Sequence, residues 1–277
     1  MKNETGSVFS VNFDLRPIKD ATIPVSMGTK SHASFLNLVG RFNPSLMARL
    51  HDEPGYRPYT VSPLYGGRVS GERMTLSRAQ LCHLRVTMLD GGALWSALQT
   101  YFREAGSIYI HLDDADFQLV RMFITPTADS SGWSGSADWQ TLVTLPAQST
   151  ITMYFATATA FSMGEHRFCL FPIPNLVWES LLHIWNRYEQ ESYTIKRRGL
   201  RESLLKTVQV THCTLRSKTL HVPTYTQKGF IERCRYTFRA TDGLTSLLTT
   251  LAAFYSGVGY KTTMEMGQEQ VSFDDRQ

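Results

Sequence analysis

The sequence predicts an α+β protein built from two tandem ferredoxin-like (RRM-like) units, each with the element order βαββαβ. Some short segments alternate apolar and polar residues, as strands do, and other segments place apolar residues at helical spacing. The same order of segments then occurs a second time along the chain. Hydrophobic residues make up 42% and charged residues 19% of the 277 residues, which is typical of a globular protein.

We assign residues 1–127 to the first unit. Apolar residues alternate with polar ones from Phe9 to Leu15 and predict a strand. A helix is expected over 31–42 with Ser31 as its N-cap, and Asn43-Pro44 predicts the start of a second helix. The remaining segments complete the unit, with strands over 59–62 and 80–88, a helix over 93–104, and strands over 108–112 and 117–125.

A stretch rich in Ser and Gly, 128–138, is the best linker candidate, and we assign 128–149 to the linker and its lead-in. Residues 150–277 form the second predicted unit. Its expected elements are a strand over 150–161, a helix from Pro174 to about Glu189, strands over 205–212, 214–222 and 230–239, a helix over 244–255, and a short strand near 271–273.

The net charge of +4 is mild, but basic residues concentrate in the stretch 195–239. Such clustering is expected of a surface that binds a polyanion, and solvated strand and loop faces are the alternative interpretation. The acidic residues of this stretch are Glu202 and Glu232. The basic ones are Lys196, Arg197, Arg198, Arg201, Lys206, Arg216, Lys218, Lys228, Arg233, Arg235 and Arg239.

The four cysteines and eight histidines lack the spacing of metal ligands, so we expect no metal and no cofactor. The chain has no run of 18 apolar residues, and its first residues lack the apolar core of a signal peptide. These features favour a soluble cytoplasmic protein without a membrane partner.

Two histidines bracket the predicted helix–Asn-Pro–helix segment, with His32 near its start and His51 near its end. The negative end of the helix dipole favours the imidazolium form of His51, which suits a general acid. A lone histidine is more often structural, but two around one helical segment favour acid–base chemistry. Lys30 and Arg57 lie nearby in the sequence and are candidates for stabilising negative charge.

A glycine-containing segment, 257–267, follows the last predicted helix. Its glycines would let backbone N–H groups approach phosphates closely, and Lys261 would add positive charge. Termination of the preceding helix is the alternative role for these glycines. The run from Lys196 to Arg201 is a further basic feature, for which a charged connection is the alternative.

Together these features resemble the CRISPR-associated repeat-cleaving endoribonucleases of the RAMP superfamily. The resemblance rests on the segment 254–264 and on Lys228-Gly229-Phe230-Ile231. It extends in order to 32–36, 50–51, 59–64, 170–174 and 185–188, and so covers almost the whole chain. Glu232 and Glu265 depart from the pattern, because the family often has glycine there, and Glu265 is expected to add a repulsive charge beside the phosphates.

The resemblance implies a metal-independent endoribonuclease that cuts CRISPR precursor transcripts once per repeat. The ribose 2′-OH attacks the adjacent phosphate and leaves 2′,3′-cyclic phosphate and 5′-OH ends, so DNA is excluded as a substrate. The resemblance further implies that His32 and His51 share the acid–base chemistry, with Arg57 and Lys30 supplying positive charge. The expected RNA-binding residues are Lys196, Arg197, Arg198, Arg201, Gly257, Gly259, Lys261 and Gly267.

CRISPR repeat RNA is the expected partner, and a CRISPR effector complex is a second candidate partner. One alternative is a non-cleaving RAMP subunit that binds the guide RNA, and the presence of both histidines favours the enzyme over it. Another is an unrelated tandem RRM protein. Neither half shows the K/R-G-F-x-F-V run of RNA-stacking sheets, which argues against this last class.

Overall fold

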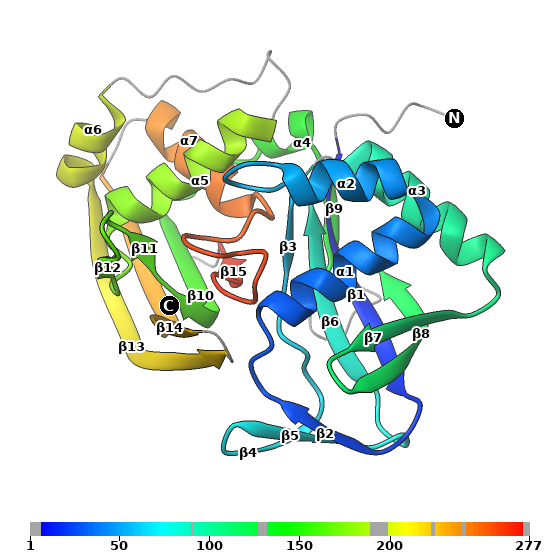
Figure 1. The fold of residues 1–277 in the computed structure, drawn as a ribbon. Coiled ribbons are helices and arrows are strands. Elements are labelled where there is room, and N and C mark those ends of the chain that lie inside the picture. Colours follow the sequence, from blue (N-terminus) through cyan, green and yellow to red (C-terminus); the bar gives the residue numbers. More distant parts are fainter. Residues whose placement is uncertain are drawn as a thin grey trace. The chain divides into compact units, whose positions relative to one another are not determined.

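The computed structural model describes residues 7–89, 91–126, 132–188, 199–222, 225–239 and 242–273 (Figure 1). The chain forms two compact units, and each contains helices and strands, so the predicted α+β class is confirmed. The first unit is Met1–Ser136 together with two short later pieces, His221–Tyr225 and Thr263–Glu265. The second unit is Ala137–Leu220, Thr226–Thr262 and Met266–Gln277.

The first unit is built on an antiparallel sheet around β1 (Figure 1). The strands of this sheet are β1 (Ser7–Pro17), β3 (Tyr59–Val61), β6 (Cys82–Met88), β7 (Ile108–Leu112) and β8 (Ala115–Phe123), in the order β3-β6-β1-β8-β7, and β9 (Gly135–Asp138) also pairs with β1. Its helices are α1 (Thr29–Phe42), α2 (Pro44–Asp52) and α3 (Gly91–Glu104). A small second sheet, not predicted from the sequence, has the order β2 (Ala21–Pro24), β5 (Arg73–Leu76), β4 (Arg68–Ser70).

Strand β1 is buried on both faces. Its apolar face packs against helices, as shown by Phe9, which stacks on Trp95 of α3 with the ring centroids 5.1 Å apart. On the other face, the Asp14 carboxylate is 2% exposed and lies 2.8 Å from His83 Nδ1 and 2.5 Å from Arg121 Nη2. The alternation in the sequence therefore separates an apolar core from a buried polar network rather than from solvent.

The predicted junction between α1 and α2 is confirmed. The side chain of Asn43 accepts a hydrogen bond of 2.9 Å from the backbone three residues later, and Pro44 lies in the first turn of α2. The predicted N-cap of α1 is wrong, because the helix begins directly after Gly28, which has no side chain to offer. Ser31 instead lies inside the helix and is fully buried.

The second unit is built on a sheet with the strand order β13-β14-β10-β15. These strands are β10 (Thr150–Thr159), β13 (Val208–Val222), β14 (Tyr225–Phe238) and β15 (Glu269–Ser272). The unit also contains α4 (Trp139–Val143), α5 (Pro174–Tyr188), α6 (Leu200–Thr207), α7 (Asp242–Ala253) and a hairpin of β11 (Phe161–Ser162) and β12 (Phe168–Cys169). Across the described part of the chain, every helix is too short or too polar to cross a membrane.

Tryptophans anchor the helices of the second unit to its sheet. Trp178 of α5 is fully buried and meets the ring of Tyr236 of β14 edge-on at 4.7 Å. Its indole Nε1 donates a hydrogen bond of 3.2 Å to the carbonyl oxygen of Leu248 in α7. One side chain thus links α5, α7 and the sheet, and its polar atom is satisfied despite burial.

The strand predicted over 205–212 is wrong at its start, because 205–207 form the end of α6. Leu200 and Leu204 are one helical turn apart and both are buried, whereas Leu205 is 64% exposed. Strand β13 then runs without interruption from Val208 to Val222, since no glycine or proline breaks it. The two strands predicted here are therefore one.

Residues 257–262 and 266–267 of the glycine segment pack within the second unit, and the three glycines of the segment have positive φ angles of 72°, 85° and 64°. A Cβ atom on Gly267 would lie 2.1 Å from the carbonyl oxygen of Val258, and one on Gly259 would lie 2.5 Å from that of Ala160. Glycine is therefore required here for two reasons, the backbone conformation and the close approach of another chain segment.

We expect Gly267→Ala to destabilise the protein by about 3 kcal/mol, because the left-handed conformation and a steric clash act together. Gly164→Ala is the matched control. Gly164 has φ +81°, but nothing lies within 4 Å of its added Cβ, so only about 1 kcal/mol of conformational cost is expected. Urea unfolding followed by tryptophan fluorescence measures both variants. Equal losses would contradict the close-approach argument.

Candidate active site

His32 lies in the first turns of α1 and is only 8% exposed. The hydroxyl oxygen of Tyr59 lies 3.2 Å from Nδ1, and the two rings stack with centroids 5.8 Å apart and an interplanar angle of 15°. The ring is also hydrogen-bonded to the backbone of Thr263, which belongs to the short C-terminal piece of this unit. These contacts hold the imidazole in one orientation.

The pKa of His32 is lowered from 6.5 to about 4, chiefly because burial disfavours the charged ring. The charges of Arg57 and then His51 lower it further, while the bond to Thr263 acts in the opposite direction. His32 is therefore neutral at neutral pH and able to accept a proton. The same effects show that three predicted site residues, His32, His51 and Arg57, lie within electrostatic reach of one another.

His51 and Arg57 meet at the end of α2. The His51 side chain is 66% exposed, with Nδ1 3.0 Å from Oδ1 of Asp52. Arg57 donates from Nε to the carbonyl oxygen of Leu50 at 3.1 Å and from Nη2 to that of His51 at 3.2 Å. These carbonyls belong to the last turn, where a helix lacks internal donors, so the guanidinium caps the helix end that carries His51.

Lys30 lies on a different side of α1 from His32, because residues two apart in a helix do not share a face. Its ammonium group forms an ion pair with Asp113 in the turn between β7 and β8. The positive charge of Lys30 is therefore compensated within the fold. Its role in charge stabilisation stays a prediction, and the geometry favours a structural role instead.

The expectation that Glu265 places a repulsive charge beside the RNA phosphates is wrong, because its side chain turns inward. Glu265 is 1% exposed, and its carboxylate accepts hydrogen bonds from Ser31 Oγ at 2.5 Å and from the backbone N–H of Met27 at 3.0 Å. This contact was not predicted from the sequence. The only local indication in the sequence was Gly28, because a glycine at the N-cap leaves the start of α1 without a capping side chain of its own.

The backbone N–H groups of the glycine segment are largely used inside the second unit. Val258 donates to Gly267 at 2.8 Å, Tyr260 to Ala160 at 2.9 Å, and Gly259 to the hydroxyl of Ser180 at 2.9 Å. Because these donors already have protein acceptors, the geometry favours a packing role for the predicted RNA-binding glycines, Gly257, Gly259 and Gly267. Their contact with RNA stays a prediction.

Lys261 lies in the same segment with a positive φ of 55° and its ammonium 5.3 Å from the centre of the Tyr260 ring. Partial burial lowers the pKa of Lys261. The side chain is therefore held against an aromatic ring rather than fully extended into solvent, and its predicted contact with RNA is not tested by this geometry.

Of the predicted RNA-binding cations near residue 200, Lys196, Arg197 and Arg198 lie outside the described residues. Arg201 is exposed in the first turn of α6. It lines a hollow of about 360 Å³ together with the carboxylates of Glu179 and Glu202. The positive charge of Arg201 is therefore partly compensated by its surroundings.

Two further arginines of the basic stretch share the exposed face of β14, since residues two apart in a strand point the same way. Arg233 lies over the ring of Tyr154 on the neighbouring β10, 5.9 Å from its centre. Arg235 lies 3.4 Å from the hydroxyl of Thr152 on the same strand. This face combines positive charge with an accessible aromatic ring.

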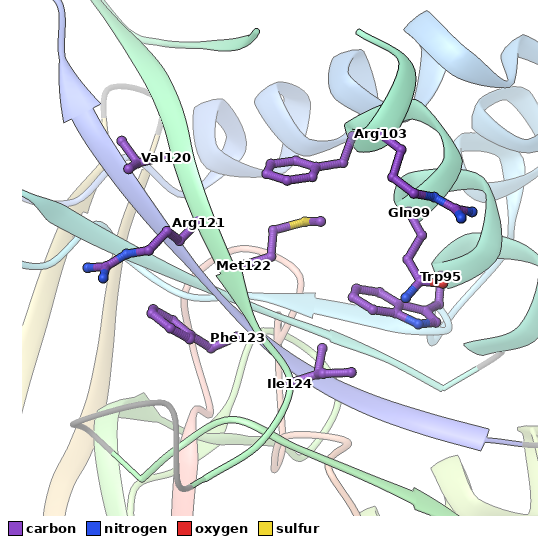
Figure 2. A pocket seen from close by; sticks show the side chains of 9 residues that line it. Trp95, Gln99, Arg103, Val120, Arg121, Met122, Phe123 and Ile124 are labelled. Atoms are coloured by element: carbon purple, nitrogen blue, oxygen red, sulfur yellow. The ribbon is translucent and has the colours of Figure 1, made fainter. Parts of the chain in front are cut away.

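A separate cavity of about 520 Å³ opens between α3 and β8 in the first unit. In Figure 2, Trp95 and Met122 lie on one side of β8, whereas Arg121 and Phe123 lie on the other. None of its lining residues is a predicted site residue or an acid–base group that titrates near neutral pH. Among the residues that the structure describes, no three His, Cys, Asp or Glu side chains gather so as to hold a metal ion.

The lowered pKa of His32 predicts a pH-dependent free energy of unfolding. Between about pH 4 and 6.5 the unfolded chain binds a proton at His32 that the native state does not bind, so stability rises with pH across this window, by roughly 3 kcal/mol. Urea unfolding at several pH values should show the rise in the wild type and in the exposed-site control His111→Gln, but not in His32→Gln. An equal rise in His32→Gln would contradict the assignment.

Two known protein families match the chain. The family described as CRISPR Cas6 N-terminal domain matches residues 8–144, and the family described as CRISPR-associated endoribonuclease Cas6 matches residues 153–269. No curated protein sequence matches the chain.

Solved structures show the same fold at low sequence identity. A Thermus thermophilus Cas6 is 24% identical with a TM-score of 0.72, covering 96% of this chain and 99% of that one. The same protein in a product complex is 23% identical with a TM-score of 0.78, covering 97% and 100%. A protein from Pyrococcus furiosus, described as Cas6-related, is 12% identical with a TM-score of 0.61, covering 98% and 100%. With both domain models matched in order, the resemblance read from the sequence is confirmed, and the chain belongs to the Cas6 family of CRISPR-associated endoribonucleases.

Proposed function

We propose that the chain cleaves CRISPR precursor transcripts within each repeat, without a metal ion, through attack of a ribose 2′-OH on the adjacent phosphate. The products are a 2′,3′-cyclic phosphate and a 5′-OH. One observation carries the proposal, the grouping of a neutral His32 with His51 and Arg57 where the start of α1 meets the end of α2. This reaction needs a base, an acid and a positive charge, and the group contains all three.

We also propose that both units are ferredoxin-like. In the first unit, β7 lies at the edge of the sheet. When β7 is left aside and β1, β3, β6 and β8 are numbered 1 to 4 along the chain, their order in the sheet is 2-3-1-4, as β3-β6-β1-β8. The second unit repeats this order as β13-β14-β10-β15. A helix follows the first strand and another follows the third strand in each unit, which supports the βαββαβ pattern.

We assign the role of base to His32, and its lowered pKa supports this assignment. A neutral imidazole accepts the proton of the 2′-OH, whereas the general acid must begin protonated. We assign the acid to His51, whose exposed ring is open to the 5′ oxygen of the leaving strand. A guanidinium does not serve as a proton-transfer group, so Arg57 stabilises the negative charge of the phosphorane while it caps α2.

Repeat RNA is the proposed partner, and a CRISPR effector complex is a second one. Two other Cas6 structures are described as a product complex and as a substrate mimic complex. These descriptions support the proposal that this chain also binds its RNA substrate. On this chain we place RNA contacts on the run Lys196-Arg197-Arg198 and on the exposed face of β14. Arginines beside an aromatic ring offer both charge and a stacking surface to unpaired bases.

A non-cleaving subunit that binds guide RNA is the alternative function. The observation that favours it is the low exposure of His32, which is 8%. A base must reach the proton that it removes, although catalytic hydrogen bonds often form only in the substrate complex. Cleavage of repeat RNA in the presence of EDTA separates the two functions.

We expect His32→Ala and His51→Ala each to slow cleavage by about 10²–10⁴-fold, because each removes a proton-transfer group. RNA affinity should change little, and the double variant should lose less than the product of the single losses. Single-turnover cleavage of labelled repeat RNA in EDTA, with analysis of the product ends, measures these effects.

The matched comparison for these variants is Lys30→Ala, since Lys30 lies next to the site in sequence but is paired with Asp113. A loss below about tenfold is expected for it, because its charge is already compensated. Wild-type rates for both histidine variants would contradict the catalytic assignment, and a strict requirement for Mg²⁺ would contradict the metal-free reaction.

Replacing Lys196, Arg197 and Arg198 together by alanine should weaken RNA binding and flatten its dependence on salt. For single-stranded RNA the slope of log affinity against log salt should fall by about 0.7 for each phosphate that the variant no longer neutralises. The control replaces Lys19, Arg68 and Arg78, three exposed cations of the first unit, and so changes the net charge equally. Equal slopes for the two triple variants would show that the run only connects two elements.

A further inference from the structure

Helix α1 lacks a cap from its own sequence. Its N-cap residue is Gly28, with φ 41°, which makes no side-chain hydrogen bond, and its first turn contains no acidic residue. The first N–H groups of a helix have no partners within the helix and carry partial positive charge. The start of α1, four residues before His32, therefore has partial positive charge that no side chain of its own first turn offsets.

The carboxylate of Glu265, from a distant part of the chain, lies beside this helix start. Its Oε2 accepts from the backbone N–H of Met27 at 3.0 Å, and its Oε1 accepts from Ser31 Oγ at 2.5 Å. The residue is 1% exposed, so these hydrogen bonds replace hydration for both carboxylate oxygens. The contact joins residues that are 238 and 234 positions apart in the sequence.

The backbone of Glu265 has a conformation that is unfavourable for a residue with a side chain, although the side chain keeps its hydrogen bonds. Its φ is 71°, in the left-handed region that favours glycine, yet the residue is glutamate. Its N–H donates to the carbonyl oxygen of Val61 in β3 at 3.1 Å, which fixes the segment against the sheet. A strained residue with a fully engaged side chain is typical of a position that serves a site.

The same three-residue segment, Thr263–Glu265, also bonds the ring of His32 through the backbone of Thr263. We propose that Glu265 is a positioning residue for the cleavage reaction. By clamping Met27 and Ser31 it fixes the start of α1, and by anchoring its own segment it fixes the Thr263 contact that orients the imidazole. The catalytic part of this proposal rests on the proposed function. The effect of Glu265 on the orientation of the His32 ring does not.

The test compares Glu265→Gly with a matched variant, Glu232→Gly. Both positions have left-handed backbones, with φ 71° and 91°, and both changes remove a carboxylate. Glu232 pairs with Arg216, and both of these residues belong to the second unit. Three quantities are measured: the single-turnover rate at saturating enzyme, the RNA dissociation constant, and the ¹⁵N chemical shifts of the His32 ring without RNA.

Glu265→Gly should lower the rate by about 10–100-fold, because the base loses its orientation, with a dissociation constant within about twofold of the wild type. The His32 ring nitrogen shifts should also change. Glu232→Gly should leave both the rate and these shifts as in the wild type. Glu265→Gln keeps the shape of the side chain but replaces one of its two acceptor oxygens with an NH2 donor, so one of the two hydrogen bonds is lost. If Glu265→Gly does not fold, this variant tests the proposal with the same three measurements.

Unchanged His32 shifts in folded Glu265 variants would overturn the positioning role, and so would an equal loss of rate in Glu232→Gly. A wild-type protein that cleaves no repeat RNA would overturn the proposed function instead. The ring shifts would still decide the role of Glu265 in that case, so the two failures are distinguishable.

Discussion

The candidate active site depends on a buried carboxylate at the start of α1. A carboxylate is costly to bury unless hydrogen bonds replace its water, and the oxygens of Glu265 find such partners in Met27 and Ser31. The neighbouring Thr263 bonds the ring of His32. A segment from the C-terminal end of the chain therefore completes the first unit and fixes both the helix and the imidazole that it carries.

The electrostatics of the site follow from this packing. Burial and the nearby charge of Arg57 keep His32 neutral, because both disfavour the imidazolium form. Arg57 is itself held in place by the carbonyl groups at the end of α2, so the same guanidinium positions His51 and sets the charge around His32. The Glu265 carboxylate lies beside the start of α1, and the Arg57 guanidinium caps the end of α2. Each helix end thus has a side chain of charge opposite to its own partial charge beside it.

Local patterns in the sequence predicted most elements and the Asn43-Pro44 junction. They also singled out His32, His51 and Arg57, whose shared role in catalysis stays a prediction. Local patterns failed where a residue that is distant in the sequence determines the local structure. Ser31 has the chemistry of an N-cap, but a carboxylate 234 positions away takes its hydroxyl and the helix starts earlier. Residue type indicates that a positive φ is possible at the glycine positions, because glycine has no Cβ. The 2.1 Å approach to the carbonyl oxygen of Val258 depends on tertiary packing that no local pattern contains.

The most direct test of the link between Glu265 and α1 is a double-mutant cycle of Ser31→Ala and Glu265→Gln, read out both as the single-turnover cleavage rate and as the free energy of unfolding. Because the two side chains share one hydrogen bond inside one network, their effects should not add. The account predicts that the double variant is no slower and no less stable than the worse single variant, within about 0.5 kcal/mol. Fully additive losses in both quantities would contradict it, since they would mean that Ser31 and Glu265 act independently.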